Sequence, residues 1–163
     1  MRIFSRKRET DQQPAAEVYT GLRQQALRLT PDQLGVADVP ILALLMETGY
    51  PEAVATLVVV ADGSSSLYFS NGGGFIGAGT HENVADASRR WLEAGLAFIE
   101  QLSNITDPPL PAEGLTQFVA VTREGLHAAV APEADLGKGD HPLSPLFFAG
   151  HDVIIQIRLV EGG

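Results

Sequence analysis

A glycine-rich stretch is the part of this sequence that most closely matches a ligand-binding motif. Residues 70–84 read SNGGGFIGAGTHENV and contain a G-x-G-x-x-G run at residues 72–77. In dinucleotide-binding proteins this run joins a parallel strand to a helix, and an acidic residue ends the next strand about 20 residues later. Here a tight Asp62-Gly63 turn makes the preceding strand antiparallel to its neighbour, and Glu100 falls on the polar face of a helix. We therefore expect no dinucleotide cofactor.

Two interpretations of the glycine-rich stretch remain open. In the first, it is a strand-to-helix connection whose glycines adopt positive φ or let the backbone approach the sheet closely. In the second, backbone N–H groups of the loop and of the following helix start bind a small anion such as phosphate. The residues of that candidate ligand site are Asn71, Gly74, Gly77, Gly79, Thr80 and His81.

Other catalytic and metal-binding signatures are incomplete. The HENVA segment begins like a zinc-protease motif, but position 85 is alanine where the second histidine ligand is needed. Lys138 is followed by glycine and not by the serine or threonine of a phosphate-binding loop. His127, His141 and His151 lack a chelating spacing within one element. We expect no catalytic residue, no metal and no cofactor.

Composition predicts one globular domain. The chain has 163 residues, 45% of them hydrophobic and 19% charged, which is enough apolar surface for an ordinary core. It contains no cysteine, which excludes disulfides and thiolate chemistry and fits a reducing cytoplasm. The N-terminus lacks the apolar region of a signal peptide, and no run of residues is long enough to span a bilayer, so we expect no stable membrane insertion.

Charge is distributed unevenly along the chain. Four of the 11 basic residues lie at or before Arg8, which leaves 7 basic against 20 acidic residues after it, a formal balance of −13. A field of that sign repels phosphate backbones, so we expect no nucleic-acid partner. We interpret residues 1–13 as a basic, disordered tail and residues 14–163 as a single domain.

The first half of that domain is expected to hold a helix, three strands and a second helix. A helix starts at Pro14 and carries an apolar stripe of Val18, Leu22, Ala26 and Leu29. Tight turns then separate apolar runs at residues 41–47, 55–61 and 66–70, which predicts an antiparallel meander. The first run lacks β-branched residues after its start and is also compatible with a helix, although strand is favoured. Residues 81–103 form an amphipathic helix with Trp91 in the core and Gly95 close to the sheet.

The second half of the domain is expected to hold a hairpin and a last helix. Two strands lie at residues 115–132 around an Arg-Glu-Gly turn, and residues 133–145 are irregular. The segment from Ser144 onward matches both a strand and a helix; its length and its Ser-Pro start favour the helix. The expected fold is α+β, with a single antiparallel sheet of about five strands, helices packed against it, and the order α-β-β-β-α-β-β-α.

Two segments carry a family resemblance. METGYPEAVATLVVVADGSSSLYFSNGGGFIGAG and DLGKGDHPLSPLFFAGH are similar to a family of small single-domain uncharacterised bacterial proteins, over residues 40–160. Separately, the element order and the small, acidic, cysteine-free composition resemble those of type III secretion chaperones, which are homodimeric binding modules. The first resemblance implies one intact domain, and the second implies a dimer that binds another protein.

These observations favour a non-catalytic protein-interaction or chaperone-like module with a protein partner, as a homodimer in the cytoplasm. The alternative is a small-ligand or enzymatic domain that uses the loop at residues 71–81, with residues 132–145 as a lid. An exposed apolar surface is expected for the first function, and a concave polar pocket at the start of the central helix for the second.

Overall fold

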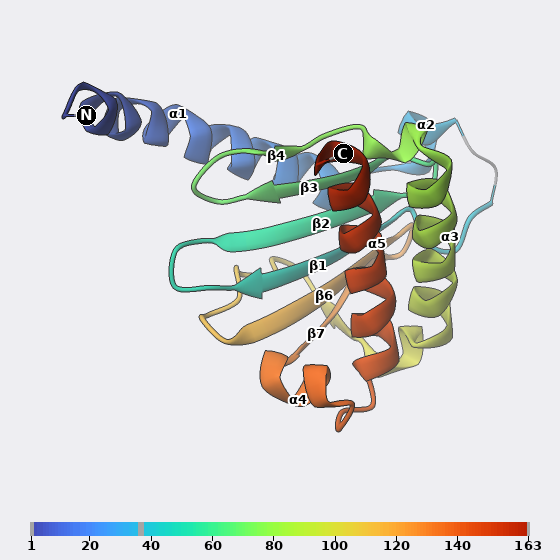
Figure 1. Cartoon of the computed structure of the whole chain (residues 1–163). Helices are drawn as coiled ribbons and strands as arrows, with labels where there is room; N and C mark the ends of the chain where they lie inside the picture. Colours follow the sequence, from blue (N-terminus) through green and yellow to red (C-terminus); the bar gives the residue numbers. More distant parts are fainter. Residues whose placement is uncertain (1, 36–37, 163) are drawn as a thin grey trace.

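The computed structural model describes residues 2–35 and 38–162, with side chains described from residue 15 to residue 161. Its centre is one antiparallel sheet in the order β4-β3-β2-β1-β6-β7-β5 (Figure 1). The strands are β1 (Ala43–Gly49), β2 (Val54–Val60), β3 (Ser65–Phe69), β4 (Gly74–Phe75), β5 (Ser103–Ile105), β6 (Leu115–Thr122) and β7 (Gly125–Pro132).

Over residues 2–35 and 38–162, five α-helices and two short 3-10 helices accompany the sheet. They are α1 (Arg2–Leu27), α2 (Pro31–Leu34), η1 (Ala78–Thr80), α3 (Glu82–Ala97), η2 (Ile99–Gln101), α4 (Glu133–Lys138) and α5 (Ser144–Gly162). None of the helices in the described part of the chain combines the length and the apolar character needed to cross a membrane.

The α+β class and the single antiparallel sheet are confirmed, but the strand number and element order need correction. The sheet has seven strands and not about five, because β4 and β5 add an edge strand on each side. These strands have two and three residues, too few for an alternating pattern to be visible in the sequence. Short helices α2 and α4 are also added to the expected order, and α4 occupies the start of the segment expected to be irregular.

Both ambiguous segments have the structure that the sequence favoured. The run at residues 41–47 forms β1, which pairs with β2 on one side and β6 on the other. Every residue of β1 is buried, since helices cover both faces of the sheet at this central strand. That double burial removes the polar-apolar alternation by which a strand is recognised. The C-terminal segment is α5, with Leu146, Val153 and Ile157 fully buried at helical spacing.

The N-terminal helix starts earlier than the sequence suggests. Figure 1 shows α1 as one continuous helix from Arg2, with its first turns extending beyond the sheet. The expected start at Pro14 therefore lies inside the helix. The division of the chain into a disordered tail at residues 1–13 and a domain at residues 14–163 stays a prediction.

The two faces of the sheet carry separate cores. Helices α3 and α5 cover one face, where Trp91, Val153 and Ile157 pack against sheet residues such as Met46 and Phe118. The helices come very close to the sheet and to each other: a Cβ added at Gly95 would lie 2.8 Å from the Leu44 side chain. The other face is covered by α1, with Leu34 of α2 also packed there, through a smaller core that includes Tyr19, Ala26, Leu27, Leu45, Val58, Tyr68 and Val119.

Candidate functional site

An ion pair in the protein interior holds α1 on the sheet. Glu47 of β1 is fully buried and Arg23 of α1 is 6% exposed. The guanidinium donates twice to the carboxylate, from Nε to Oε2 at 2.6 Å and from Nη2 to Oε1 at 2.8 Å. Nη2 also donates to the carbonyl oxygen of Pro108 at 3.0 Å. Because a buried charge is tolerated only when it is paired and hydrogen-bonded, these contacts fix the rotation of α1 about its own axis.

Neutral side chains complete the hydrogen bonding of this ion pair. Thr56 of β2 donates to Glu47 Oε2 at 3.0 Å, and the Gln117 amide of β6 donates to Oε1 at 3.2 Å. The Gln117 amide also donates to the carbonyl oxygen of Pro109 at 2.7 Å, so the proline-rich connection joins the cluster. The Tyr19 hydroxyl lies 2.7 Å from the Thr56 hydroxyl. The carboxylate thus has partners from one helix and two strands.

Tyr19 and Tyr68 lie beside the ion pair and are buried with it. Their rings meet edge to face, with centroids 6.0 Å apart. Burial raises the pKa of Tyr19 to about 12, with a smaller contribution from the nearby Glu47 charge, and the hydrogen bond between Tyr19 and Thr56 acts in the opposite direction. Burial likewise raises the pKa of Tyr68. Both phenols are neutral at physiological pH, so this part of the interface carries no charge except at the ion pair.

The ion pair determines which side of α1 remains uncovered. Arg23 and Tyr19 point into the sheet face, and the apolar stripe expected from the sequence lies beside them on the helix. Within that stripe Ala26 is buried, Leu22 and Leu29 are half-buried, and Val18 is 60% exposed. The stripe is therefore only partly covered by the chain itself.

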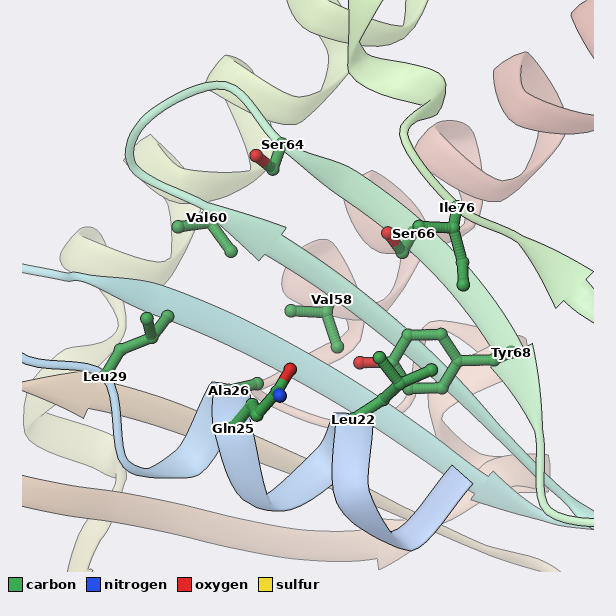
Figure 2. A pocket seen from close by; sticks show the side chains of 10 residues that line it. All are labelled: Leu22, Gln25, Ala26, Leu29, Val58, Val60, Ser64, Ser66, Tyr68 and Ile76. Atoms are coloured by element: carbon green, nitrogen blue, oxygen red, sulfur yellow. The ribbon is translucent and has the colours of Figure 1, made fainter. Parts of the chain in front are cut away.

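The uncovered side of α1 faces an apolar groove. One part, with a volume of about 170 Å³, lies between α1 and strands β2 and β3; Figure 2 shows Leu22, Ala26 and Leu29 on one side and Val58 and Tyr68 on the other. A second part, of about 300 Å³, continues toward β4. We call both parts together the α1 groove. The described residues that line it carry no charge; they are Ala15, Val18, Tyr19, Leu22, Gln25, Ala26, Leu29, Val58, Val60, Ser64, Ser66, Tyr68, Phe69, Gly72, Gly73, Gly74 and Ile76.

The glycine-rich stretch forms one end of the α1 groove. It begins as a tight turn between β3 and β4, in which Gly72 N–H donates to the Phe69 carbonyl at 3.0 Å. Gly72 has a φ of 108°, and a Cβ there would lie 2.9 Å from the Ala15 side chain of α1. Further along, a Cβ at Gly79 would lie 2.0 Å from the carbonyl oxygen of Gly63. The glycines thus have the positive φ and close backbone approach of the first interpretation.

The candidate anion-binding residues are spread over that turn, η1 and the start of α3. All of them are exposed except Gly79, which is half-buried. Ala78, the first residue of η1, lies between Gly77 and Gly79 and is buried. His81 is the N-cap residue of α3 and makes no side-chain capping hydrogen bond. An anion site here stays a prediction.

The expected lid lies far from the glycine-rich loop. Residues 132–145 follow β7, whereas the loop borders β4 at the opposite end of the strand order. Figure 1 shows α4 and η1 at different ends of the molecule. The two segments therefore do not enclose a common cavity.

The histidines are also separate from one another. His127 lies in β7, His141 precedes α5 and accepts a hydrogen bond from the Leu143 N–H at 3.0 Å, and His151 lies within α5. Over residues 2–35 and 38–162, no group of three or more His, Asp or Glu side chains has an arrangement that would hold a metal ion.

The sequence contains a signal for the Arg23–Glu47 ion pair, although the motif patterns do not include it. Glu47 directly follows the apolar run of residues 41–46. A carboxylate in a strand that is buried on both faces requires a cation, and Arg23 lies on the long helix that precedes that strand in the chain.

The fold and the groove define the protein as a single-sheet α+β domain with an apolar surface cleft. Comparisons with protein-family models, with curated proteins and with solved structures give no match.

Proposed function

We propose that this protein is a non-catalytic binding module that holds an apolar, positively charged segment of a partner protein in the α1 groove. The observation that carries the proposal is the continuous groove between α1 and β2–β4, with an apolar stripe of α1 along one side. Exposed apolar surface of this kind is typical of sites that another chain covers. Ile76 at the mouth is 67% exposed and Val18 is 60% exposed.

The chemistry of the partner segment follows from the lining and from the overall charge. Among residues 15–161, whose side chains the structure describes, the groove has no charged side chain to pair with, so the part of the segment that enters it is expected to be apolar. The chain after Arg8 has a formal balance of −13, so basic residues flanking the apolar part are attracted over several ångströms. An amphipathic segment with apolar residues such as leucine on one side and basic residues such as lysine on the other meets both requirements.

The remaining parts of the proposal come from the sequence. The protein acts as a homodimer in the cytoplasm, as its similarity to secretion chaperones and its lack of cysteine suggest. Sedimentation equilibrium tests the dimer: the mass of two chains supports it, and the mass of one chain over the whole concentration range contradicts it.

Fluorescence anisotropy with two labelled peptides tests the groove. Both peptides have about 15 residues and the same leucine pattern, one with lysine and one with glutamate at the polar positions. We expect the lysine peptide to bind and the glutamate peptide to bind more weakly. Equal binding of both peptides contradicts the charge argument, and no binding of the lysine peptide contradicts the proposal.

A matched pair of variants distinguishes the groove from the rest of the surface. Ile76→Asn removes an exposed apolar side chain at the groove, and Val130→Asn removes one that is 51% exposed on β7. We expect Ile76→Asn to weaken binding about tenfold, the loss of one partly buried side chain. We expect Val130→Asn to leave it unchanged. Equal effects of the two variants contradict binding in the groove.

A further inference from the structure

A second cavity lies on the opposite face of the sheet from the α1 groove. Its volume is about 300 Å³, and it is bordered by α5 on one side and by β2 and β3 on the other. Most of its lining is apolar, contributed by Ala55, Leu67, Phe69, Ile154 and Ile155. A cavity of this size with mostly apolar sides and a few polar groups is typical of a small-molecule site.

Three polar side chains complete the lining: Tyr50, His151 and Arg158. The Tyr50 hydroxyl donates to Glu133 Oε2 at 3.2 Å, which ties the phenol to the start of α4. Arg158 on α5 is exposed and makes no ion pair with any residue that the structure describes. The cavity therefore has one cationic group available, while the nearby carboxylate of Glu133 already has a hydrogen-bond donor.

His151 gives the cavity a buried polar atom. Its ring lies against Phe147, with centroids 4.3 Å apart, and its Nε2 atom is buried without a hydrogen-bond partner among the described residues. A buried polar atom without a partner lowers stability. Burial lowers the pKa of His151, an effect that Arg158 reinforces and Glu133 opposes. The ring is thus neutral near pH 7 and leaves Arg158 as the charged group of the lining.

We infer that this cavity binds a small organic carboxylate whose apolar body lies against Leu67, Phe69 and Ile154 and whose carboxylate pairs with Arg158. A planar guanidinium matches a carboxylate in charge and in geometry. A phosphate or another fully polar anion does not match the lining, because most of it offers no hydrogen bond. This site lies across the sheet from the α1 groove, and Phe69 borders both.

The test uses the full chain and three probes with the same phenyl group. They are phenylacetate, the neutral 2-phenylethanol and the cation phenethylamine, each titrated while backbone amide signals are recorded by NMR. We expect phenylacetate to shift the signals of Tyr50, Ala55 and His151, with a Kd of about 1 mM or tighter. We expect the other two probes to bind more weakly.

Matched variants test the role of Arg158. Arg158→Gln is expected to weaken phenylacetate binding about fivefold, whereas Arg28→Gln, at an exposed arginine in the turn after α1, leaves it unchanged. Ala55→Leu fills the cavity and is expected to abolish the shifts. No shift at these signals, equal binding of the three probes, or shifts confined to the α1 groove would each overturn the inference.

Discussion

Arg23 and Glu47 form a two-point ion pair between α1 and the central strand, with contacts of 2.6 and 2.8 Å and almost no exposure to solvent. The contact connects two residues that are 24 positions apart. It sets which side of α1 is buried, and in this way it leaves the apolar stripe of the helix facing the α1 groove.

Removing the cation of this pair is expected to be strongly destabilising. Arg23→Met leaves the Glu47 carboxylate buried without its charge partner, and losses of about 3–5 kcal/mol are typical of that change. Urea unfolding measures the difference. Arg28→Met, at an exposed position in the turn directly after α1, is the control and is expected to change stability by less than about 0.5 kcal/mol. Similar losses in both variants would contradict a structural role for the pair.

The sequence predicted the elements that are long enough to carry a pattern. Three strands of the meander, the hairpin at residues 115–132, the central helix and the choice of helix for α5 were all visible from periodicity and turn residues. Trp91 is fully buried, as its place on the apolar face indicated. The two edge strands were missed because two or three residues show no period.

The α1 groove could not be predicted from the sequence, for a different reason. The stripe of Val18, Leu22, Ala26 and Leu29 correctly predicts an amphipathic helix, but such a stripe normally faces the core. Here the side facing the sheet also contains a charge, Arg23, whose partner lies on another element. Only the three-dimensional structure shows that the chain itself covers this stripe incompletely.

Two glycines provide opposite tests of backbone packing. Gly79→Ala would place a Cβ 2.0 Å from the backbone oxygen of Gly63, which cannot move independently, so a loss of about 1–3 kcal/mol is expected. Gly21→Ala, on the exposed side of α1, meets nothing within 4 Å and is expected to stabilise the protein by up to about 1 kcal/mol. Thermal unfolding of both variants measures the signs, and a stabilising Gly79→Ala would contradict the close contact.

The tyrosines predict a loss of stability at alkaline pH. The chain has three tyrosines, and burial raises the pKa of each, to about 12 for Tyr19. The unfolded chain releases these protons near pH 10 and the folded chain holds them, so stability present below pH 10 is lost as the pH rises toward 12. Absorbance of tyrosinate should appear together with unfolding. Tyrosinate formed near pH 10 in the folded protein would contradict the burial.

The lowered pKa of His151 predicts a loss of stability at acidic pH. Its pKa is lowered from the usual 6.5, so the unfolded chain takes up a proton first. The stability that the neutral His151 ring contributes is present above pH 6.5 and is lost as the pH falls below that value. An NMR titration measures the pKa directly. Glu133→Gln removes a charge that favours the protonated ring and should lower the pKa further; an unchanged or raised pKa would contradict the arrangement around α5.

The central claim is that a partner segment enters the α1 groove, and the footprint of a bound peptide tests it most directly. Amide signals of the full chain are recorded by NMR during titration with the leucine-lysine peptide. The account predicts shifts concentrated at α1 and at β2–β4, including Leu22, Tyr68 and Ile76, and their loss in the Ile76→Asn variant. Shifts concentrated on α3 and α5, or spread evenly over the acidic surface, would contradict it.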